Sequence, residues 1–474
     1  MKIQKKNKNI CLAGTVVTFI CYFLFYFIYN NLDTAANHRT LIYMLSVVQI
    51  FIIVYIIKTW EYISNKIFTP YIFIAMFLVL YGCGQSLLWV VNLNRDMGIL
   101  RGLLYGVYVV HSDTEIVRMM LYINICLMFF HLGALFCLKD HGGHINSESY
   151  EKLTKNILFA VSAVILALCV SLVFGKLNTV MEIVSYKGYA ALYHSDSMEN
   201  TQLLQIANEL FVPSLIGLLI GSDYKKSVVV VCYVIFGIYA IGYSIAGSRG
   251  SWFPYFIVFL WLHIRYKGGF KKKTVIWLLI LGFLLMYLLQ LIMLLRSGGG
   301  IDDLFTLEQF PLFSLLSEMG GSAGVTLIAL AQKIHWPYSN SILAAVLSSA
   351  TTRVATMFNL DVVAGANWFS QDVLRLNWGT GFSIFVEMYV NYNEYIAPLL
   401  MFIIGWMIAS LVYENDTARD TSTLRLFILS STMGILVVLG RCALLELTRK
   451  IVRGVLLYAL VVIVIRSLIR SRRG

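Results

Sequence analysis

Long apolar runs, each about as long as a bilayer is thick, recur along most of this 474-residue chain. A helix of roughly twenty apolar residues spans the hydrocarbon core of a membrane. The first run, residues 10–29, has this length and ends without a small-residue cleavage site, so we predict that it is retained as a membrane helix. Hydrophobic residues make up 59% of the chain, more than a soluble domain can bury. The sequence therefore predicts an all-α polytopic membrane protein.

The apolar runs predict about twelve membrane helices. Their expected ranges are 10–29, 40–57, 70–91, 119–137, 157–174, 204–221, 228–246, 251–264, 274–295, 396–413, 424–440 and 451–466. The eighth is short for a crossing, so it either extends into its flanks or is partly re-entrant. We expect three parts: an N-terminal helix bundle (1–295), one large extracytoplasmic segment with short helices (296–398), and C-terminal membrane helices (399–474).

The distribution of charge predicts which way the chain is inserted. If the N-terminal lysines lie in the cytoplasm, the inner segments carry 22 Lys and Arg and the longer outer segments carry 15. Basic residues collect on the cytoplasmic side of membrane proteins. We therefore predict a cytoplasmic (inner) membrane protein with both termini in the cytoplasm. The formal charge of +12 is then a consequence of topology, and no nucleic-acid partner is expected.

The type of basic residue also differs between the two sides. On the inside, Lys outnumbers Arg 15 to 7, whereas on the outside Arg outnumbers Lys 11 to 4. The planar guanidinium group of Arg grips phosphate or carboxylate with two hydrogen bonds and stays charged. The Arg-rich outer side indicates phosphate or carboxylate ligands there.

Two arginines at expected outer helix ends stand beside glycines. Arg249 lies in the turn Gly247–Gly250, and Arg296 precedes three glycines. Small neighbours allow a ligand to approach the backbone and the guanidinium group together. The alternative is that each Arg reaches from a helix end to the membrane interface. The repeated arrangement favours a functional site.

Three further arginines are candidates for binding an anionic substrate. Arg353 follows a run of small residues, and Arg441 has no acidic neighbour at helical spacing. Arg449 lies in the same short outer turn as Arg441 and is expected to pair with Glu446 on one helical turn.

Glu318 and Glu387 are the acidic candidates in the large outer segment. Glu387 lies in an apolar run that also contains Tyr389. A carboxylate in such a setting is costly unless it is paired or used. It is either a catalytic base or one half of an Arg–Glu bridge. We find no nucleotide-binding motif and no cysteine or acidic cluster with metal-ligand spacing, so no cofactor and no metal are expected.

Three short motifs in this architecture resemble those of the Wzy-type O-antigen polymerases. They are Gly247–Gly250, Arg296–Gly299, and Gly379–Ser383 followed by Glu387, Tyr389 and Asn391. The resemblance implies a fold of the C-type glycosyltransferase class and an enzyme that polymerises oligosaccharide repeat units carried on undecaprenyl diphosphate. It implies catalytic roles for Glu387, Glu318, Arg249 and Arg296. It also implies that Arg249, Arg296, Arg353, Arg441, Arg449 and Tyr389 bind diphosphate or sugar.

The resemblance also implies binding partners, and it leaves two alternative functions to be considered. Expected partners are undecaprenyl-diphosphate-linked oligosaccharides, membrane lipids and a chain-length regulator, in lipopolysaccharide biosynthesis. An O-antigen ligase would have a similar architecture and donor. A flippase or other transporter belongs to a different class. Transporters are commonly built from internal repeats with polar residues near mid-membrane. Here no repeat is evident and the polar residues cluster on outer loops, which favours an enzyme.

Overall fold

The computed structural model describes most of the chain and assigns it to two compact units. The described residues are 2–32, 37–91, 101–104, 107–137, 148–187, 201–245, 252–268, 310–376, 380–413 and 422–471, with separate positions between 273 and 291. Unit 1 comprises residues 1–142, 312–416 and 437–446, and unit 2 comprises residues 143–311, 417–436 and 447–474.

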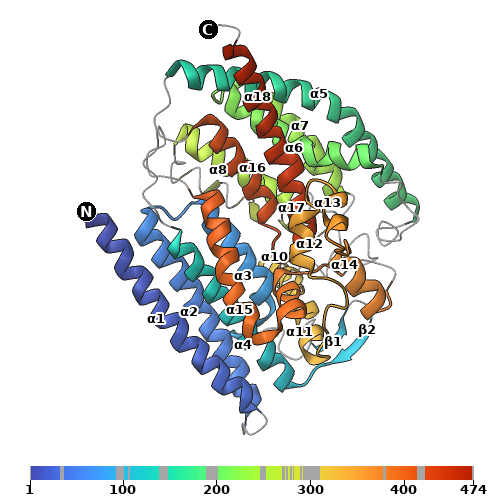
Figure 1. Cartoon of the computed structure of the whole chain (residues 1–474). Helices are drawn as coiled ribbons and strands as arrows, with labels where there is room; N and C mark the ends of the chain where they lie inside the picture. The colour runs from blue at the N-terminus through green and yellow to red at the C-terminus, as the bar shows by residue number, and fades with distance from the viewer. Residues whose placement is uncertain are drawn as a thin grey trace. The chain divides into compact units, whose positions relative to one another are not determined.

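Unit 1 is built around α4 (Asp113–Phe136), which packs against α1, α2, α3, α11 and α15. The most apolar window of α4 is 94% buried, whereas the corresponding window of α1 is only 17% buried. Thus α4 is the core helix of the unit and α1 lies at its edge (Figure 1). The helices around it are α1 (Lys2–Asn30), α2 (His38–Ser64), α3 (Pro70–Trp89), α10 (Pro311–Gly320), α11 (Ala323–Ala331), α12 (Ser341–Leu347), α13 (Thr352–Met357), α14 (Gly365–Trp368), the π-helix η6 (Phe369–Val373) and α15 (Ile384–Val412).

Glycines allow the closest helix contacts in unit 1. A Cβ atom added at Gly133 of α4 would collide with the carbonyl group of Phe402, and one added at Gly405 of α15 would collide with that of Phe130. The two backbones therefore touch directly, as small residues permit in membrane proteins. Glycines at positions 84 and 320 bring α3 and α10 together in the same way.

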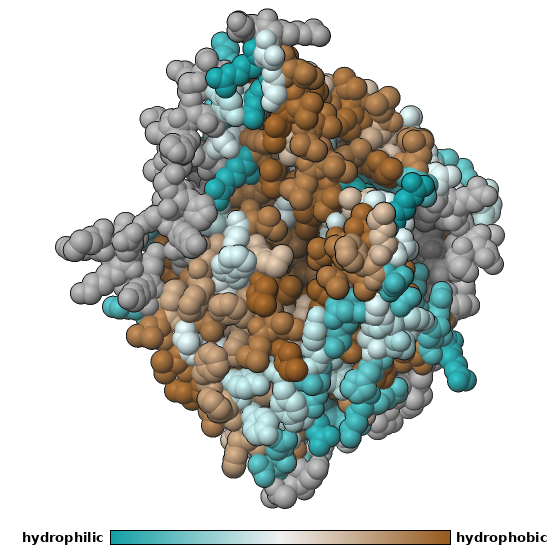
Figure 2. All heavy atoms as spheres, viewed as in Figure 1, coloured by the Kyte–Doolittle hydropathy of each residue, from teal (hydrophilic) through white to brown (hydrophobic). Residues whose placement is uncertain are grey.

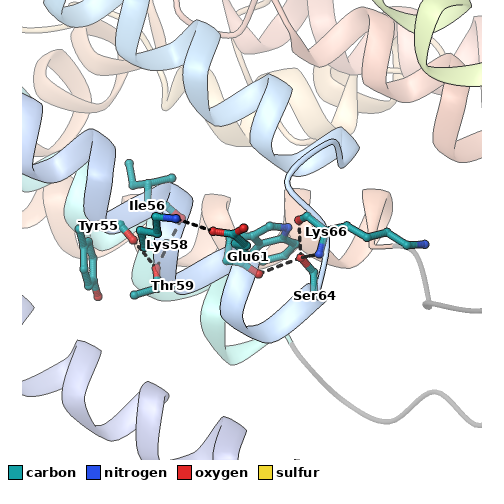
Figure 3. Close-up of polar contacts among 8 residues, drawn as sticks. Tyr55, Ile56, Lys58, Thr59, Glu61, Ser64 and Lys66 are labelled. Atoms are coloured by element: carbon teal, nitrogen blue, oxygen red, sulfur yellow. Dashed lines mark hydrogen bonds and ion pairs between the residues drawn. The ribbon is translucent and has the colours of Figure 1, made fainter. Parts of the chain in front are cut away.

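Buried polar side chains of unit 1 form hydrogen bonds that join different helices. His131 of α4 is fully buried, and its two ring nitrogens lie 2.6 Å from the hydroxyl of Thr59 and 2.8 Å from that of Tyr71. Thr59 belongs to the last turns of α2, where Lys58 and Glu61 form an ion pair of 2.9 Å (Figure 3). Charged residues here mark the end of the apolar part of α2.

Helix α15 is two helices joined at a break. Asn393 has φ 67° and ψ 176°, and these backbone angles lie far from those of an α-helix. Its side chain accepts hydrogen bonds from the amide groups of Tyr395 and Ile396, so it caps the second helix. The second part begins close to the predicted start of the span 396–413, and the first part extends the helix toward Ile384.

Unit 2 is organised around α5 (Glu148–Lys187) and α6 (Gln202–Gly221), which pack along each other. A Cβ atom added at Gly221 would lie 2.7 Å from the amide nitrogen of Phe159, so the two backbones approach closely. The other helices are α7 (Lys226–Ile245), α8 (Phe253–Lys267), α16 (Thr423–Leu436), the π-helix η7 (Val452–Leu456) and α18 (Leu457–Ser471). Helix α17 (Leu444–Ile451) begins in unit 1 and ends in unit 2.

Among the described residues, ten helices are long and apolar enough to cross a membrane. Nine of them coincide with predicted spans. The tenth, Leu312–Ala331, lies inside the segment that was expected to be extracytoplasmic, and it packs into unit 1 through α10 and α11. Two predicted spans correspond to the shorter helices α8 and α16, and the span 274–295 lies mostly outside the described residues. The three-part division by sidedness stays a prediction.

The surface of the molecule fits a bilayer. Large apolar side chains such as Phe23, Phe51 and Leu168 are between 67% and 68% exposed. Brown hydrophobic atoms form broad areas on the face shown in Figure 2, and hydrophilic atoms form narrower bands. Besides helices, the described residues contain one antiparallel ribbon of β1 (Arg101–Leu104) and β2 (Val107–Val110), with Arg101 paired to Val110. The chain is a multi-pass membrane protein.

Candidate functional site

Glu387 is buried in unit 1 and is held by two uncharged donors. Ser383 caps the start of α15 by accepting from the amide group of Val386, which places Glu387 in the first turn of the helix. The side chain is 1% exposed. The hydroxyl of Ser341 donates to Oε1 at 2.9 Å, and the amide group of Leu444 donates to Oε2 at 2.8 Å. Glu387 thus caps the N-terminus of α17, where a negative charge is stabilised by the helix dipole.

The Arg–Glu bridge, one of the two alternatives for Glu387, is not seen within the described part of the chain. Both carboxylate oxygens of Glu387 are instead occupied by Ser341 and Leu444. A buried carboxylate without a cation needs such donors, because hydrogen bonds to the charged form replace those it made to water. Because the side chain is 1% exposed, a substrate hydroxyl can reach the carboxylate only if the residues that cover it move.

Asn391 lies one turn after Glu387 on α15 and forms hydrogen bonds with Glu387 and with its partner Ser341. Its Nδ2 donates to the hydroxyl of Ser341 at 2.9 Å and to the carbonyl of Glu387 at 2.8 Å, and its Oδ1 accepts from the amide group of Ser341 at 3.1 Å. Residues i and i+4 share a helix face, which explains why Glu387 and Asn391 meet the same residue. We call Glu387, Ser341, Asn391 and the Leu444 amide the Glu387 cluster. Sequence reasoning found its α15 residues and missed Ser341.

Tyr389 lies beside aromatic residues and is only 3% exposed. Its ring centroid is 6.0 Å from that of Tyr122 and 6.5 Å from that of His335. His335 is exposed and nearly parallel to the Tyr389 ring. The predicted sugar contact of Tyr389 therefore requires access past its neighbours, and it stays a prediction. His335 is the exposed aromatic group at this place and was not found from the sequence.

The Gly379–Ser383 motif meets Arg441 through the backbone. The amide group of Phe382 donates to the carbonyl of Arg441 at 3.0 Å, and that of Ile384 donates to the carbonyl of Leu439 at 3.3 Å. Gly381 has φ +80°, and a Cβ atom there would lie 3.3 Å from the Arg441 carbonyl. The positive φ favours glycine at this position, and a side chain there would also crowd the Arg441 carbonyl.

Arg441 and Glu318 are brought to the same part of unit 1. Both lie within electrostatic range of the Tyr81 hydroxyl on α3, and both side chains are exposed. Arg353 is also exposed and lies in the first turn of α13. Arg249 and Arg296 lie outside the described residues, so their predicted roles stay predictions.

Arg449 is in unit 2, within electrostatic range of the buried Glu209 of α6. Lys450 and Arg453 are also within electrostatic range of Glu209. Sequence analysis missed Glu209 and did not weigh Arg453. The available signal was an ionisable residue inside an apolar run, which is uncommon in membrane helices and marks a functional position.

These clusters contain groups that bind anions and none that is typical of a metal site. Among the described residues, no group of three or more His, Cys, Asp or Glu is placed to hold a metal ion. Guanidinium groups in general suit phosphate. Each unit has such groups: Arg441 lies in unit 1, and Arg449 and Arg453 lie in unit 2.

Comparison with known proteins identifies the family. The family model described as O-antigen polysaccharide polymerase Wzy matches residues 11–472, nearly the whole chain. Neither the curated proteins nor the solved structures gave a match. The expected resemblance is confirmed, and the chain belongs to the O-antigen polysaccharide polymerase Wzy family.

Proposed function

We propose that this protein polymerises oligosaccharide repeat units carried on undecaprenyl diphosphate, at the outer face of the cytoplasmic membrane. The single observation that carries the proposal is the family match over residues 11–472. The ten membrane-crossing candidates and the arginine-containing clusters support it, because a lipid-linked anionic substrate requires both a membrane and cations. With Lys2, Lys5, Lys6 and Lys8 inside, both termini lie in the cytoplasm.

The reaction transfers a growing chain from its carrier to a new unit. A hydroxyl oxygen at the non-reducing end of the incoming lipid-linked unit attacks the anomeric carbon of the donor chain. The bond between that carbon and the diphosphate oxygen breaks, and the lipid diphosphate leaves with the electron pair. The hydroxyl proton passes to a base or to water. No nucleotide is consumed, since the leaving group already carries the driving force.

The arginines are proposed to bind the diphosphates of donor and acceptor. Arg249, Arg296, Arg353, Arg441 and Arg449 are the candidates, and a cation beside the leaving oxygen stabilises the charge that develops there. Glu318, like Arg441, lies within electrostatic range of Tyr81 and is exposed, and it is proposed to have a catalytic role. A chain-length regulator is proposed as the protein partner.

For Glu387 the geometry favours a positioning role. Its two oxygens bind Ser341 and Leu444, so the side chain fixes the start of α12 and the start of α17 relative to α15. The role of catalytic base remains the alternative. The two roles differ in their tolerance of glutamine, which keeps the shape of the side chain and cannot take up a proton.

The proposed function is tested in a strain that lacks the gene. The surface glycolipid of this strain is separated on a silver-stained gel with and without the complementing gene. A polymerase defect leaves lipid bearing a single repeat unit and no ladder of longer chains. A ligase defect leaves lipid without any repeat unit, and a transporter defect leaves units on the inner leaflet. Either of the last two patterns would refute the proposal.

A further inference from the structure

Two short helices of unit 1, α12 and α13, carry large apolar side chains on their outside. On α12, Leu343 is 49% and Val346 is 53% exposed. At the end of α13, Met357 is 82% and Phe358 is 65% exposed. The buried positions of the two helices hold small residues instead, namely Ala344, Ala345, Ser348 and Ala355. The large side chains therefore point away from the core of the unit, which indicates an apolar partner.

The two helices belong to an element that is closed at its base. The amide group of Ser339 donates to Oδ2 of Asp361 at 3.2 Å, and the amide group of Asp361 donates to the hydroxyl of Ser339 at 2.6 Å. We call residues 339–361 the clasped hairpin. Within it α12 and α13 pack against each other (Figure 1), and their first turns are capped by Asn340 and Thr351. The apolar side chains are thus presented on a preformed element.

The base of the clasped hairpin is bound to α15 where the crossing helix begins. Nδ2 of Asn340 donates to the hydroxyl of Tyr392 at 2.6 Å. The break at Asn393 follows directly, and the second helix of α15 starts there. In its first two turns Ile396 is 47% and Leu399 is 40% exposed, as expected for a surface that faces lipid. The clasped hairpin therefore leaves the protein at the level where the lipid-facing surface of α15 begins.

The residues around the apolar side chains are typical of a membrane interface. Trp336 and Tyr338 directly precede the clasped hairpin, with ring centroids 5.4 Å apart, and Tyr338 is 40% exposed. Trp and Tyr collect where a membrane meets water. Exposed polar residues lie between the two apolar pairs, among them Thr352, Arg353 and Thr356. Segments that lie in the interface plane combine an apolar side of this kind with polar and basic residues.

We propose that the clasped hairpin inserts into the bilayer, in the leaflet where the second helix of α15 begins, which is the outer leaflet in the predicted topology. Val346, Met357 and Phe358 contact the acyl chains, and the polar residues between them stay among the headgroups. Ser341, the first residue of α12, donates to Glu387 at 2.9 Å, so the insertion holds the Glu387 cluster at the membrane surface. This inference goes beyond the proposed function and does not depend on the reaction.

The experiment measures how deep the clasped hairpin lies in phosphatidylcholine nanodiscs that contain the full-length protein. The fluorescent residue acridonylalanine replaces Met357 or Val346, and the lipids carry a quenching doxyl group either near the headgroup or near the chain end. An interfacial segment lies about 5–10 Å deep, so the doxyl group near the headgroup should remove about half or more of the fluorescence at both positions. The doxyl group near the chain end should quench less.

Two reference positions calibrate the quenching. Phe51 of α2 is 68% exposed in the middle of a membrane helix, so there the doxyl group near the chain end should quench more. Asp372 of η6 is an exposed carboxylate, which requires water, and iodide in the buffer should quench it while the lipids do not. If Met357 and Val346 both behave like Asp372, the insertion is overturned. Quenching at one of them alone overturns insertion of the clasped hairpin as a whole.

Photocrosslinking in cell membranes identifies what covers the apolar side chains. Phe358→p-benzoylphenylalanine is expected to give an adduct with the mass of one lipid, as Phe51→p-benzoylphenylalanine should. An adduct with a second copy or with another protein overturns the lipid assignment, and so does the absence of an adduct at Phe358 when Phe51 gives one. The gel assay is independent: lipid adducts in a protein that never restores the ladder would leave the insertion standing and refute the polymerase function.

Discussion

Removing the Glu387 side chain should destabilise unit 1 more than any other single change in its cluster. Glu387→Ala deletes the acceptor for the Ser341 hydroxyl and the Leu444 amide, which donate at 2.9 Å and 2.8 Å. A hydrogen bond to a charged group contributes about 1.5–3 kcal/mol, so the two together contribute about 3–6 kcal/mol. The free energy of unfolding of a typical protein is about 5–15 kcal/mol. We therefore expect little folded Glu387→Ala protein.

Glu387→Gln should retain much of the structure. The amide oxygen accepts from Leu444 and the amide nitrogen donates to Ser341, so both contacts persist as neutral hydrogen bonds. The loss of charge costs about 1 kcal/mol for each bond, or about 2 kcal/mol in all. If Glu387 acts by positioning, the variant should lower the melting temperature and still produce a shortened ladder.

The assay combines two measurements on the same variants. Melting temperature is followed by fluorescence-detected size exclusion, and chain growth by the silver-stained gel of the complemented deletion strain. Glu394→Gln is the matched control, because this carboxylate lies on the same helix and is half-buried. Its effect on the free energy of unfolding should stay within about 0.5 kcal/mol.

Two results would refute this reasoning. A Glu387→Gln protein with an unchanged melting temperature and no ladder would show that proton transfer, and not positioning, is the role of this residue. A Glu387→Ala protein as stable as the wild type would show that the hydrogen bonds of the cluster contribute little. Ser341→Ala adds a further check: its effect should not add to that of Glu387→Ala, since both remove one shared contact.

Three other predictions test the fold. Gly405→Val should abolish folded protein, because a side chain there collides with the α4 backbone, whereas Gly237→Val, which has open space around it, should be tolerated; protein yield after size exclusion measures both. Asn393→Ala should lower stability by about 1 kcal/mol through loss of the cap at the α15 break, as thermal unfolding would show, and an unchanged melting temperature would argue against the cap. Thiol labelling should reach Gly300→Cys in spheroplasts and Lys271→Cys only after permeabilisation, and the reverse pattern would invert the topology.

The lengths of the apolar runs in the sequence predict most of the membrane helices in the structure. Nine of the ten membrane-crossing candidates were predicted, because the bilayer imposes a uniform length and composition on such helices. The helix pair Leu312–Ala331 was missed, since Gly320, Gly321 and Ser322 interrupt the apolar run at the junction of α10 and α11. The break at Asn393 was missed for a similar reason: a positive φ at a single asparagine leaves no trace in hydropathy.

The candidate sites were less predictable, because their contacts join distant parts of the chain. Ser341 and Leu444 lie 46 and 57 residues from Glu387, and local patterns carry no information about such pairs. Glu387 itself was found because a carboxylate stood out in an apolar run. Glu209 stands in an apolar run in the same way, but it lies within a predicted span and not in an expected outer loop. An ionisable residue inside a span is the more informative signal of the two.

Among the described residues two glutamates are buried, Glu209 and Glu387, and they are stabilised in different ways. Glu387 has each oxygen occupied by a protein donor, so its charge is compensated when the protein is empty. Glu209 has cations within electrostatic range, and its Oε2 has no hydrogen-bond partner among the described residues. A fold can use the first arrangement to hold itself together. The second arrangement contributes less to the free energy of unfolding, because one carboxylate oxygen makes no hydrogen bond to a described residue.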